Sequence, residues 1–316
     1  MKPRFPEVNG RLGLGVGMDL PWGAPVGFAH EPGRGDHVTD PVVRFLSSHA
    51  GAFRYLFTSF QPRSRNHLDP REYVDAYDDL FARIPAFSVR ALHQTTFNLG
   101  ALEAYDRSRI IDFTNALVDR YHFAWVNEDL GLWSIHGRPL PYPLPPYLTP
   151  EGLDAAIRNT AEVQEKLVAP LFVEFPGFSD GTSFFVGQMH AYDFFRAVVE
   201  ETRSPATLDV GHLLSYQWLL GKRGEALFGE LERLPLDHCF EIHLSGCAID
   251  GDSFMDHHHG VLLDEQFELL RRLLPLCPNL SAITYEDPRL DAEGRLAPET
   301  VASFERLRAA VDAWLS

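Results

Sequence analysis

Eight short apolar runs, each followed by a longer amphipathic stretch, constrain the fold of this 316-residue chain more than any other feature. Each apolar run has the length of a β-strand and is bounded by polar or turn-forming residues. The expected strands cover residues 12–18, 52–58, 88–93, 123–128, 171–175, 206–210, 239–245 and 282–286. The stretches between them carry apolar residues at steps of three and four, which is the helical period. We therefore expect helices over 40–51, 70–83, 104–120, 149–168, 190–202, 213–234, 264–274 and 298–314.

Strands that alternate with helices eight times predict an α/β fold of the (β/α)8 TIM barrel type, for which about 250 residues are typical. The additional residues are expected in two long loops, 21–40 and 134–147, of a single domain that spans residues 1–316. The prolines of the second loop predict an extended, stiff segment. A doubly wound open sheet is the alternative, but it normally carries a GxGxxG phosphate turn after its first strand. Gly13, Gly15 and Gly17 alternate instead, as expected of small residues at a crowded barrel floor.

Charge and composition argue against several classes of protein. With 28 Lys and Arg against 44 Asp and Glu, the formal net charge of −16 argues against a surface that binds nucleic-acid phosphates. No run approaches the roughly 20 apolar residues of a membrane span, and the start has no signal-peptide core. Three cysteines without CxxC spacing are typical of reduced thiols. We therefore expect a soluble cytoplasmic protein with no nucleic-acid or membrane partner.

Histidines and carboxylates lie where the last six expected strands end. In a TIM barrel, the catalytic groups sit at the carboxyl ends of the strands. A cluster of buried carboxylates repels itself unless cations neutralise it, and mixed His and carboxylate ligands suit Fe, Zn, Mn or Co. Each residue alone has an ordinary structural explanation, so the prediction depends on the whole set. The candidates are His93, Glu128, Asp129, Glu174, Asp209, His212, Glu241, His243 and Glu286, with Asp256 and His258 from the loop after the seventh strand.

Several motifs resemble those of a known barrel family. They are Pro143-Leu-Pro145, Thr149-Pro-Glu-Gly-Leu153, Gln164, Glu174-Phe-Pro176, Leu208-Asp209-Val210, Glu241-Ile-His243-Leu-Ser-Gly246 and Tyr285-Glu286-Asp287. The order of the candidate ligands resembles the metal pattern of the xylose-isomerase-like barrel superfamily, which includes endonuclease IV. The closer resemblance is to the multinuclear non-haem iron-dependent oxidative enzymes, which include the methanobactin biosynthesis oxidase.

The chain departs from that family in three places. A His-Ser-Glu-Asn-type motif is expected after the second strand, where residues 56–61 contain neither His nor carboxylate. Asn127-Glu128-Asp129 stands where Ser-Glu-His is expected, and Glu174-Phe175 where Glu-Asn is expected. The site nearest strands two to four is therefore the least complete.

The resemblance implies two or three iron ions in a mixed-valent Fe(II)/Fe(III) state, with Zn or Mn as alternative metals. Asp209, His243 and Glu174 are the residues it implies in catalysis. Glu241 is implied either as a bridge or as a carboxylate behind the ligands. The implied ligand sets are Glu174, Asp209, His243 and Glu286; then His212, Asp256 and His258; and, more weakly, His93 and Glu174 with Glu128 or Asp129.

The implied reaction uses O2 to modify a side chain, usually Cys, of a ribosomally made precursor peptide in natural-product biosynthesis. The family also implies a separate partner protein that recognises the leader peptide. Two other functions stay open. One is a Zn- or Mn-dependent hydrolase or isomerase of the same superfamily, although the three lysines, Lys2, Lys166 and Lys222, lie away from the strand ends where an isomerase would need one. The other is a non-catalytic binding protein with a degraded metal site.

Overall fold

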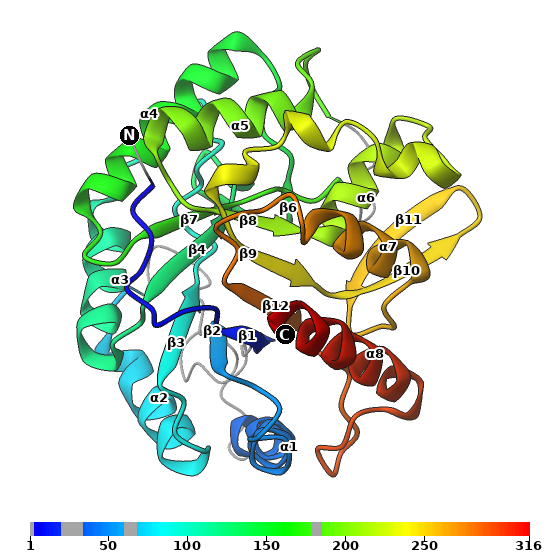
Figure 1. Ribbon diagram of the computed structural model, residues 1–316. Coiled ribbons are helices and arrows are strands. Elements are labelled where there is room, and N and C mark those ends of the chain that lie inside the picture. Colours follow the sequence, from blue (N-terminus) through cyan, green and yellow to red (C-terminus); the bar gives the residue numbers. More distant parts are fainter. Residues whose placement is uncertain (1–2, 20–33, 60–67, 179–184) are drawn as a thin grey trace.

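The computed structural model describes residues 3–19, 34–59, 68–178 and 185–316. Within these ranges, eight parallel strands close into a barrel in the order β1-β12-β9-β8-β7-β4-β3-β2. Helices surround the strands on all sides (Figure 1). This confirms the predicted TIM barrel. The barrel strands are β1 (Gly13–Asp19), β2 (Tyr55–Ser59), β3 (Val89–His93), β4 (Trp125–Asp129), β7 (Leu171–Glu174), β8 (Ala206–Asp209), β9 (Cys239–Leu244) and β12 (Ala282–Glu286).

The helices follow the expected order, with differences at their ends. They are α1 (Arg34–Ser48), α2 (Arg71–Arg83), α3 (Ser108–Tyr121), α4 (Pro150–Lys166), α5 (Ala191–Thr202), α6 (Val210–Leu219), α7 (Asp264–Leu273) and α8 (Pro298–Leu315). Thr149 caps α4, because its hydroxyl accepts a hydrogen bond from the amide of Gly152 at 3.1 Å. The helix expected from residue 40 begins at Arg34, so Pro41 lies inside it. The helix expected from residue 104 begins only at Ser108.

The expected helix over 213–234 is wrong at both ends. Its helix, α6, begins at Val210, because Asp209 acts as the N-cap, and it ends at Leu219. Gly221 and Gly224 then take positive φ angles of 79° and 55°, which break the helical path. Three short 3-10 turns, η1 (Gly224–Phe228), η2 (Leu231–Arg233) and η3 (Leu236–His238), follow instead.

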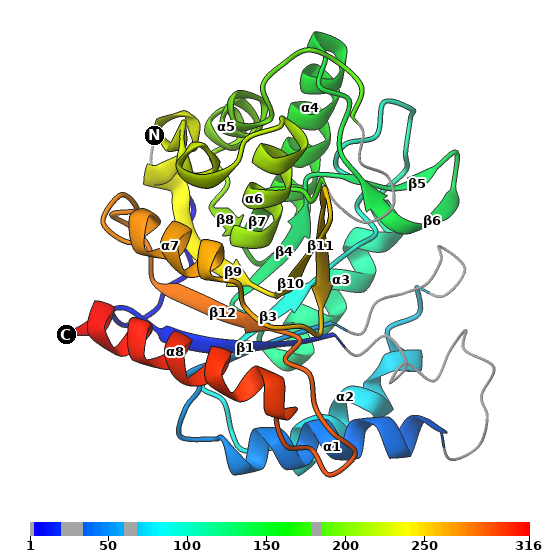
Figure 2. The same ribbon diagram turned by 90° about the vertical axis from the view of Figure 1, so that its right-hand side faces the viewer.

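Two segments expected as loops are β-hairpins at the carboxyl end of the barrel. The proline-rich segment pairs as β5 (Leu132–Ile135) with β6 (Arg138–Leu144), and Figure 2 shows this hairpin projecting beyond the barrel strands. Pro139, Pro141 and Pro143 alternate along β6, which is an edge strand and tolerates residues without an N–H. The loop after β9 pairs as β10 (Gly246–Asp250) with β11 (Ser253–His258). Most of the other expected loop, 21–40, lies outside the described residues, and its last residues belong to α1.

The barrel interior is apolar at its floor and polar above it. Alternate residues of a strand point to the same face, so every second residue points into the barrel. Tyr55, Trp125 and Phe172 fill the floor, with the rings of Trp125 and Phe172 stacked at 5.3 Å between centroids. A Cβ atom on Gly15 would lie 2.2 Å from the Tyr55 ring, which confirms that the floor needs a glycine there. The next inward positions toward the carboxyl ends carry the polar residues of the site.

None of the helices within the described ranges is both long and apolar enough to cross a membrane.

Candidate metal centre

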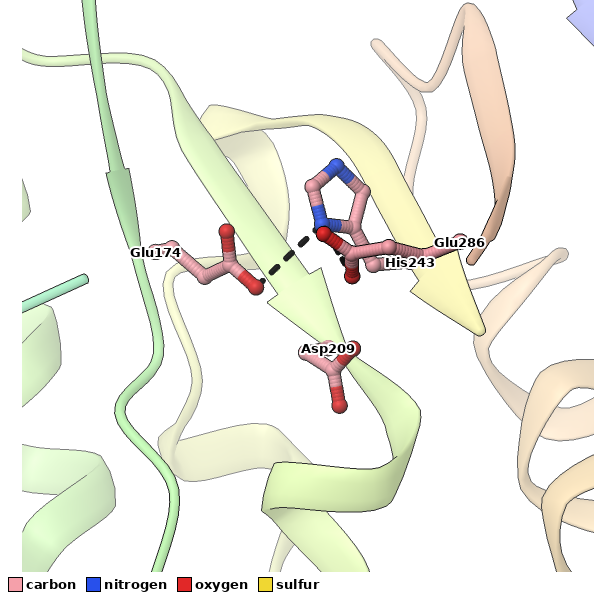
Figure 3. Close-up of side chains that lie close together, drawn as sticks. All are labelled: Glu174, Asp209, His243 and Glu286. Atoms are coloured by element: carbon pink, nitrogen blue, oxygen red, sulfur yellow. Dashed lines mark ion pairs between the residues drawn. The ribbon is translucent and has the colours of Figure 1, made fainter. Parts of the chain in front are cut away.

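Four neighbouring strands each direct one buried side chain to the same point above the floor. These side chains are Glu174 on β7, Asp209 on β8, His243 on β9 and Glu286 on β12, and each offers a ligand atom within 4.8 Å of the others. The Nδ1 atom of His243 lies 3.2 Å from Oε1 of Glu174 and 3.5 Å from Oε2 of Glu286 (Figure 3). The structure thus brings together all four residues of the first predicted ligand set.

The beginning of α6 builds a second group from Asp209, His212 and Asp256. Asp209 caps this helix, because its Oδ1 accepts a hydrogen bond from the amide of His212 at 2.7 Å. Nδ1 of His212 donates to the carbonyl oxygen of Phe175 at 2.7 Å. Nε2 of His212 is therefore the nitrogen available to a metal, and it faces Oδ2 of Asp256 at 3.4 Å. Asp256 itself is held by Ser245, whose hydroxyl donates to its Oδ1 at 2.7 Å.

A third group shares its members with the first two. It consists of Asp129, Glu174 and His212, with Oδ1 of Asp129 lying 3.7 Å from Nδ1 of His212. On the other side of Asp129, Oδ2 lies 3.6 Å from Nε2 of His93. Because the third group uses the same nitrogen of His212 that binds the Phe175 carbonyl, it competes with that hydrogen bond.

Glu128 lies apart from these groups. Asn127 and Asp129 point into the barrel, so the side chain of Glu128 between them points outward. There it accepts hydrogen bonds from the amides of Phe97 at 2.8 Å and Asn98 at 2.6 Å, and so holds the loop after β3. Burial raises the pKa of Glu128 to about 8, against the lowering effect of these two amides.

Two other predicted ligands have protein partners of their own. Glu241 lies one inward position below His243, where Tyr55, Trp125 and Thr284 donate to its carboxylate. His258 belongs to none of the three groups, and its Nδ1 lies 3.3 Å from Oδ2 of Asp287. The sequence prediction that His258 accompanies His212 and Asp256 therefore needs a rearrangement of this contact.

Two residues that sequence analysis did not single out shape the site. Asn127 donates from its Nδ2 to Glu174 and accepts at its Oδ1 a hydrogen bond from Thr207. Phe57, on β2, packs against two of the histidines at the barrel mouth, with centroid distances of 5.4 Å to His93 and 4.8 Å to His243. Strand alternation is the signal that identifies both, because they hold the inward positions two residues after Trp125 and Tyr55.

The charges of the site depend strongly on one another. Burial raises the pKa of Asp209. The charge of His212 lowers this pKa, but the nearby Asp256 raises it, and the result is about 7. Burial would lower the pKa of His212, but Asp209, Asp129 and other carboxylates raise it to about 10. Without a metal, bound protons on these groups offset the repulsion between the buried carboxylates. Metal binding would displace them, because ligands must be ionised carboxylates and neutral imidazoles.

The donor atoms fit a metal. Six buried polar atoms of the site have no hydrogen-bond partner among the described residues, and a group left in that state costs about 1–3 kcal/mol. Cations bound by the carboxylate oxygens and by one nitrogen of each imidazole would satisfy most of them, and the second nitrogen of His243 faces Glu241 instead. The atoms are Nε2 of His93, Oδ1 of Asp129, Oδ2 of Asp209, both ring nitrogens of His243 and Oδ2 of Asp256.

Comparison with known proteins identifies the family. A family model described as "RiPP precursor modification enzyme MbnB/TglH/ChrH" matches residues 72–304, where RiPP denotes a ribosomally synthesised and post-translationally modified peptide. The chain belongs to this family. Membership confirms the resemblance inferred from the motifs, and it makes the barrel mouth of this MbnB/TglH/ChrH relative the candidate active site.

Curated relatives carry no more specific description. A UPF0276 protein of Paraburkholderia phytofirmans is 30% identical over 196 residues, which are 58% of this chain and 60% of the relative. A second UPF0276 protein, from Rhizobium meliloti, is 28% identical over 199 residues, 59% and 60% of the two chains. The chain thus spans about 60% of the length of these relatives.

Solved structures show the fold. An L-ribulose 3-epimerase superposes with a TM-score of 0.50 at 13% identity, over 95% of this chain and 94% of that chain. A GH5 cellulase from an Icelandic hot spring isolate superposes with a TM-score of 0.53 at 10% identity, over 99% and 95%. At these identities, the likeness supports the TIM barrel fold and carries no information on the reaction.

Proposed function

We propose that this protein is a multinuclear non-haem iron enzyme that uses O2 to modify a side chain of a ribosomally made precursor peptide. Cys is the expected residue. The observation that carries the proposal is the buried cluster of carboxylates and imidazoles in a member of a peptide-modifying family, with polar atoms that no group in the described part of the chain satisfies. Such mixed ligands suit iron and leave coordination positions open.

Two ions fit the described ligands better than three. One would take Glu174, Asp209, His243 and Glu286, and the other Asp209, His212 and Asp256. A third ion at Asp129 would need Nδ1 of His212, which donates to a backbone carbonyl. On the side of β2, the inward residue is the apolar Phe57. His93 and Asp129 would then flank the ions as a pair.

The three proposed catalytic residues, Glu174, Asp209 and His243, would hold the first ion together with Glu286. When bound, iron supplies activation of O2 and coordination of a substrate thiol as its thiolate. Asn127 fixes the orientation of Glu174, and the helix cap fixes that of Asp209. The Phe57 ring covers one side of His243 and keeps water from it.

The substrate and partners follow from the family and the shape of the mouth. The β5–β6 and β10–β11 hairpins flank the carboxyl ends of the barrel strands, where an extended precursor peptide has to reach the metals (Figure 2). Asn98 attaches the first hairpin to the loop after β3, through hydrogen bonds from the amide of Trp133 at 2.7 Å and to the carbonyl of Ser134 at 2.9 Å. We further propose that a separate protein recognises the leader peptide and that the enzyme acts in the cytoplasm.

Metal analysis of protein produced without oxygen tests the proposal. We expect about two iron ions per chain, with Mössbauer and EPR spectra of a coupled pair, and O2 consumption when the precursor peptide and its partner are added. His243→Ala should lose iron and keep its circular dichroism spectrum, whereas Glu128→Gln, outside the three groups, should keep the iron. Protein that contains and binds only zinc would favour the hydrolase, and protein that binds no metal would favour the non-catalytic barrel.

A further inference from the structure

A carboxylate lies beneath the candidate ligands, in a pocket made of hydrogen-bond donors. The side chain of Glu241 is fully buried, with 0% exposed. Its Oε2 accepts a hydrogen bond from the indole N–H of Trp125 at 2.8 Å. Its Oε1 accepts from the hydroxyl of Thr284 at 2.5 Å and from that of Tyr55 at 3.2 Å. Both oxygens are therefore already engaged from below, which leaves Glu241 poorly placed to bridge two metals.

The remaining contact of Glu241 is with a candidate ligand. Glu241 and His243 are two residues apart on β9, so their side chains point to the same face. Oε1 of Glu241 lies 3.2 Å from Nε2 of His243, a nitrogen that makes no hydrogen bond with any described residue and would need only a small turn of the ring to align with this oxygen. On the other side of the same ring, Nδ1 lies 3.2 Å from Oε1 of Glu174, in the first ligand group. The imidazole of His243 thus lies between Glu241, which belongs to none of the three groups, and the carboxylates of the candidate metal site.

Stability of the fold does not explain this carboxylate. Replacing buried ionic groups by apolar residues of similar volume is often neutral or stabilising. The floor just below is apolar and aromatic, with Tyr55, Trp125 and Phe172 in one cluster. A charged acceptor among such groups is expected where it acts on a neighbouring functional residue, and the neighbour here is His243.

We propose that Glu241 is a positioning residue that accepts the Nε2–H of His243 and thereby makes Nδ1 the metal-binding nitrogen. This inference rests on the proposed metal site. A metal-bound His commonly donates its other N–H to a carboxylate, which fixes the tautomer and the ring orientation. The donors from Tyr55, Trp125 and Thr284 keep the carboxylate in place below the ring. Loss of such a partner typically weakens metal binding by about 10- to 100-fold.

The first experiment compares metal affinity and stability in two variants. Zn²⁺ alone is the probe, titrated against a competing chelator, and urea denaturation reports stability. Glu241→Gln should weaken binding of the Zn²⁺ ion in the first ligand group, which contains His243, by about 10- to 100-fold. Phe172→Leu is the matched control, because it loosens the aromatic floor and leaves all three donors to Glu241 and its contact with His243; it should lose stability and bind Zn²⁺ like the wild type. Equal Zn²⁺ affinity in Glu241→Gln and the wild type would overturn the inference, as would equal weakening in both variants.

The second experiment uses the wild-type chain and therefore does not depend on whether a variant folds. Protein labelled with 15N at its histidines is loaded with Zn²⁺, and the ring nitrogens of His243 are assigned by long-range 1H–15N correlation. We expect a metal-bound Nδ1 and a protonated Nε2. A metal-bound Nε2 would overturn the role of Glu241 and leave the proposed function intact. A wild-type chain that binds neither zinc nor iron would instead refute the proposed function, and the inference with it.

Discussion

Gly211 limits how closely α6 can approach the second ligand group. It is the second residue of the helix, and a Cβ atom there would lie 2.9 Å from Sγ of Cys247, 3.1 Å from Oδ2 of Asp256 and 3.2 Å from Oδ1 of Asp209. Ala is favoured over Gly inside a helix by about 1 kcal/mol. Overpacking of a tight core costs about 1–3 kcal/mol. We therefore expect Gly211→Ala to lower the free energy of unfolding by a net of about 1 kcal/mol.

The same methyl group should also disturb the metal site. It meets oxygens of Asp209 and Asp256, which are short, buried side chains with little room to turn away. Moving either carboxylate changes the geometry around Nε2 of His212. We expect the Zn²⁺ ion in the second ligand group, made of Asp209, His212 and Asp256, to bind about tenfold less tightly.

A double-mutant cycle with Cys247→Ala isolates the cause. Removing Sγ of Cys247 opens the tightest of the three contacts, so the double variant should recover about 1 kcal/mol relative to the sum of the single changes. Urea denaturation followed by circular dichroism measures stability, and calorimetric titration measures Zn²⁺ binding. A Gly211→Ala variant that is at least as stable as the wild type would refute the reasoning. A double-mutant cycle that shows no coupling would refute it as well.

Three further changes separate stability from function. Asp209→Asn keeps a good N-cap and removes a buried charge, so it should retain or raise stability without metal and lose metal binding, as urea denaturation and calorimetry would show. Burial raises the folded-state pKa of Glu128 to about 8, so the folded protein binds the extra proton and this group makes stability fall as pH rises from about 4.5 to about 8. Glu128→Gln should flatten that part of the curve, measured as urea midpoints across this range; an unchanged slope would contradict it. Asn98→Ala removes the bonds to Trp133 and Ser134 and should speed hydrogen exchange in the β5–β6 hairpin, with no increase in α5.

The barrel and the first ligand group could be predicted because both depend on local pattern. Apolar runs of strand length identify the strands, and their polar last residues share one end of the barrel. Alternation along a strand would also have placed Glu128 outside the cluster, since it lies between Asn127 and Asp129. The pocket around Glu241 needs contacts between residues more than 100 positions apart, such as that with Trp125, and no local pattern records these.

Where the expected structure was wrong, the observed structure depends on interactions beyond local propensity. Alternating prolines indicate an extended chain equally well in a free loop and in an edge strand, and the difference lies in pairing with Leu132–Ile135. The end of α6 depends on Gly221 and Gly224, whose positive φ angles outweigh the apolar periodicity that continues beyond them. The position of the His258 side chain depends on Asp287, which lies 29 residues later in the sequence, after α7 and β12.

The second strand contributes to the surroundings of His243, although it lacks the metal-binding motif that the family pattern predicts. β2 carries Tyr55 and Phe57 at its inward positions, and Phe57 lies in the 56–61 stretch where the family pattern predicts metal-binding residues. The hydroxyl of Tyr55 donates to Glu241, and the Phe57 ring packs 4.8 Å from His243. Both residues therefore support the surroundings of His243, one from beneath and one from the side. If His243 binds metal as proposed, β2 would support that site through these two contacts in place of supplying ligands.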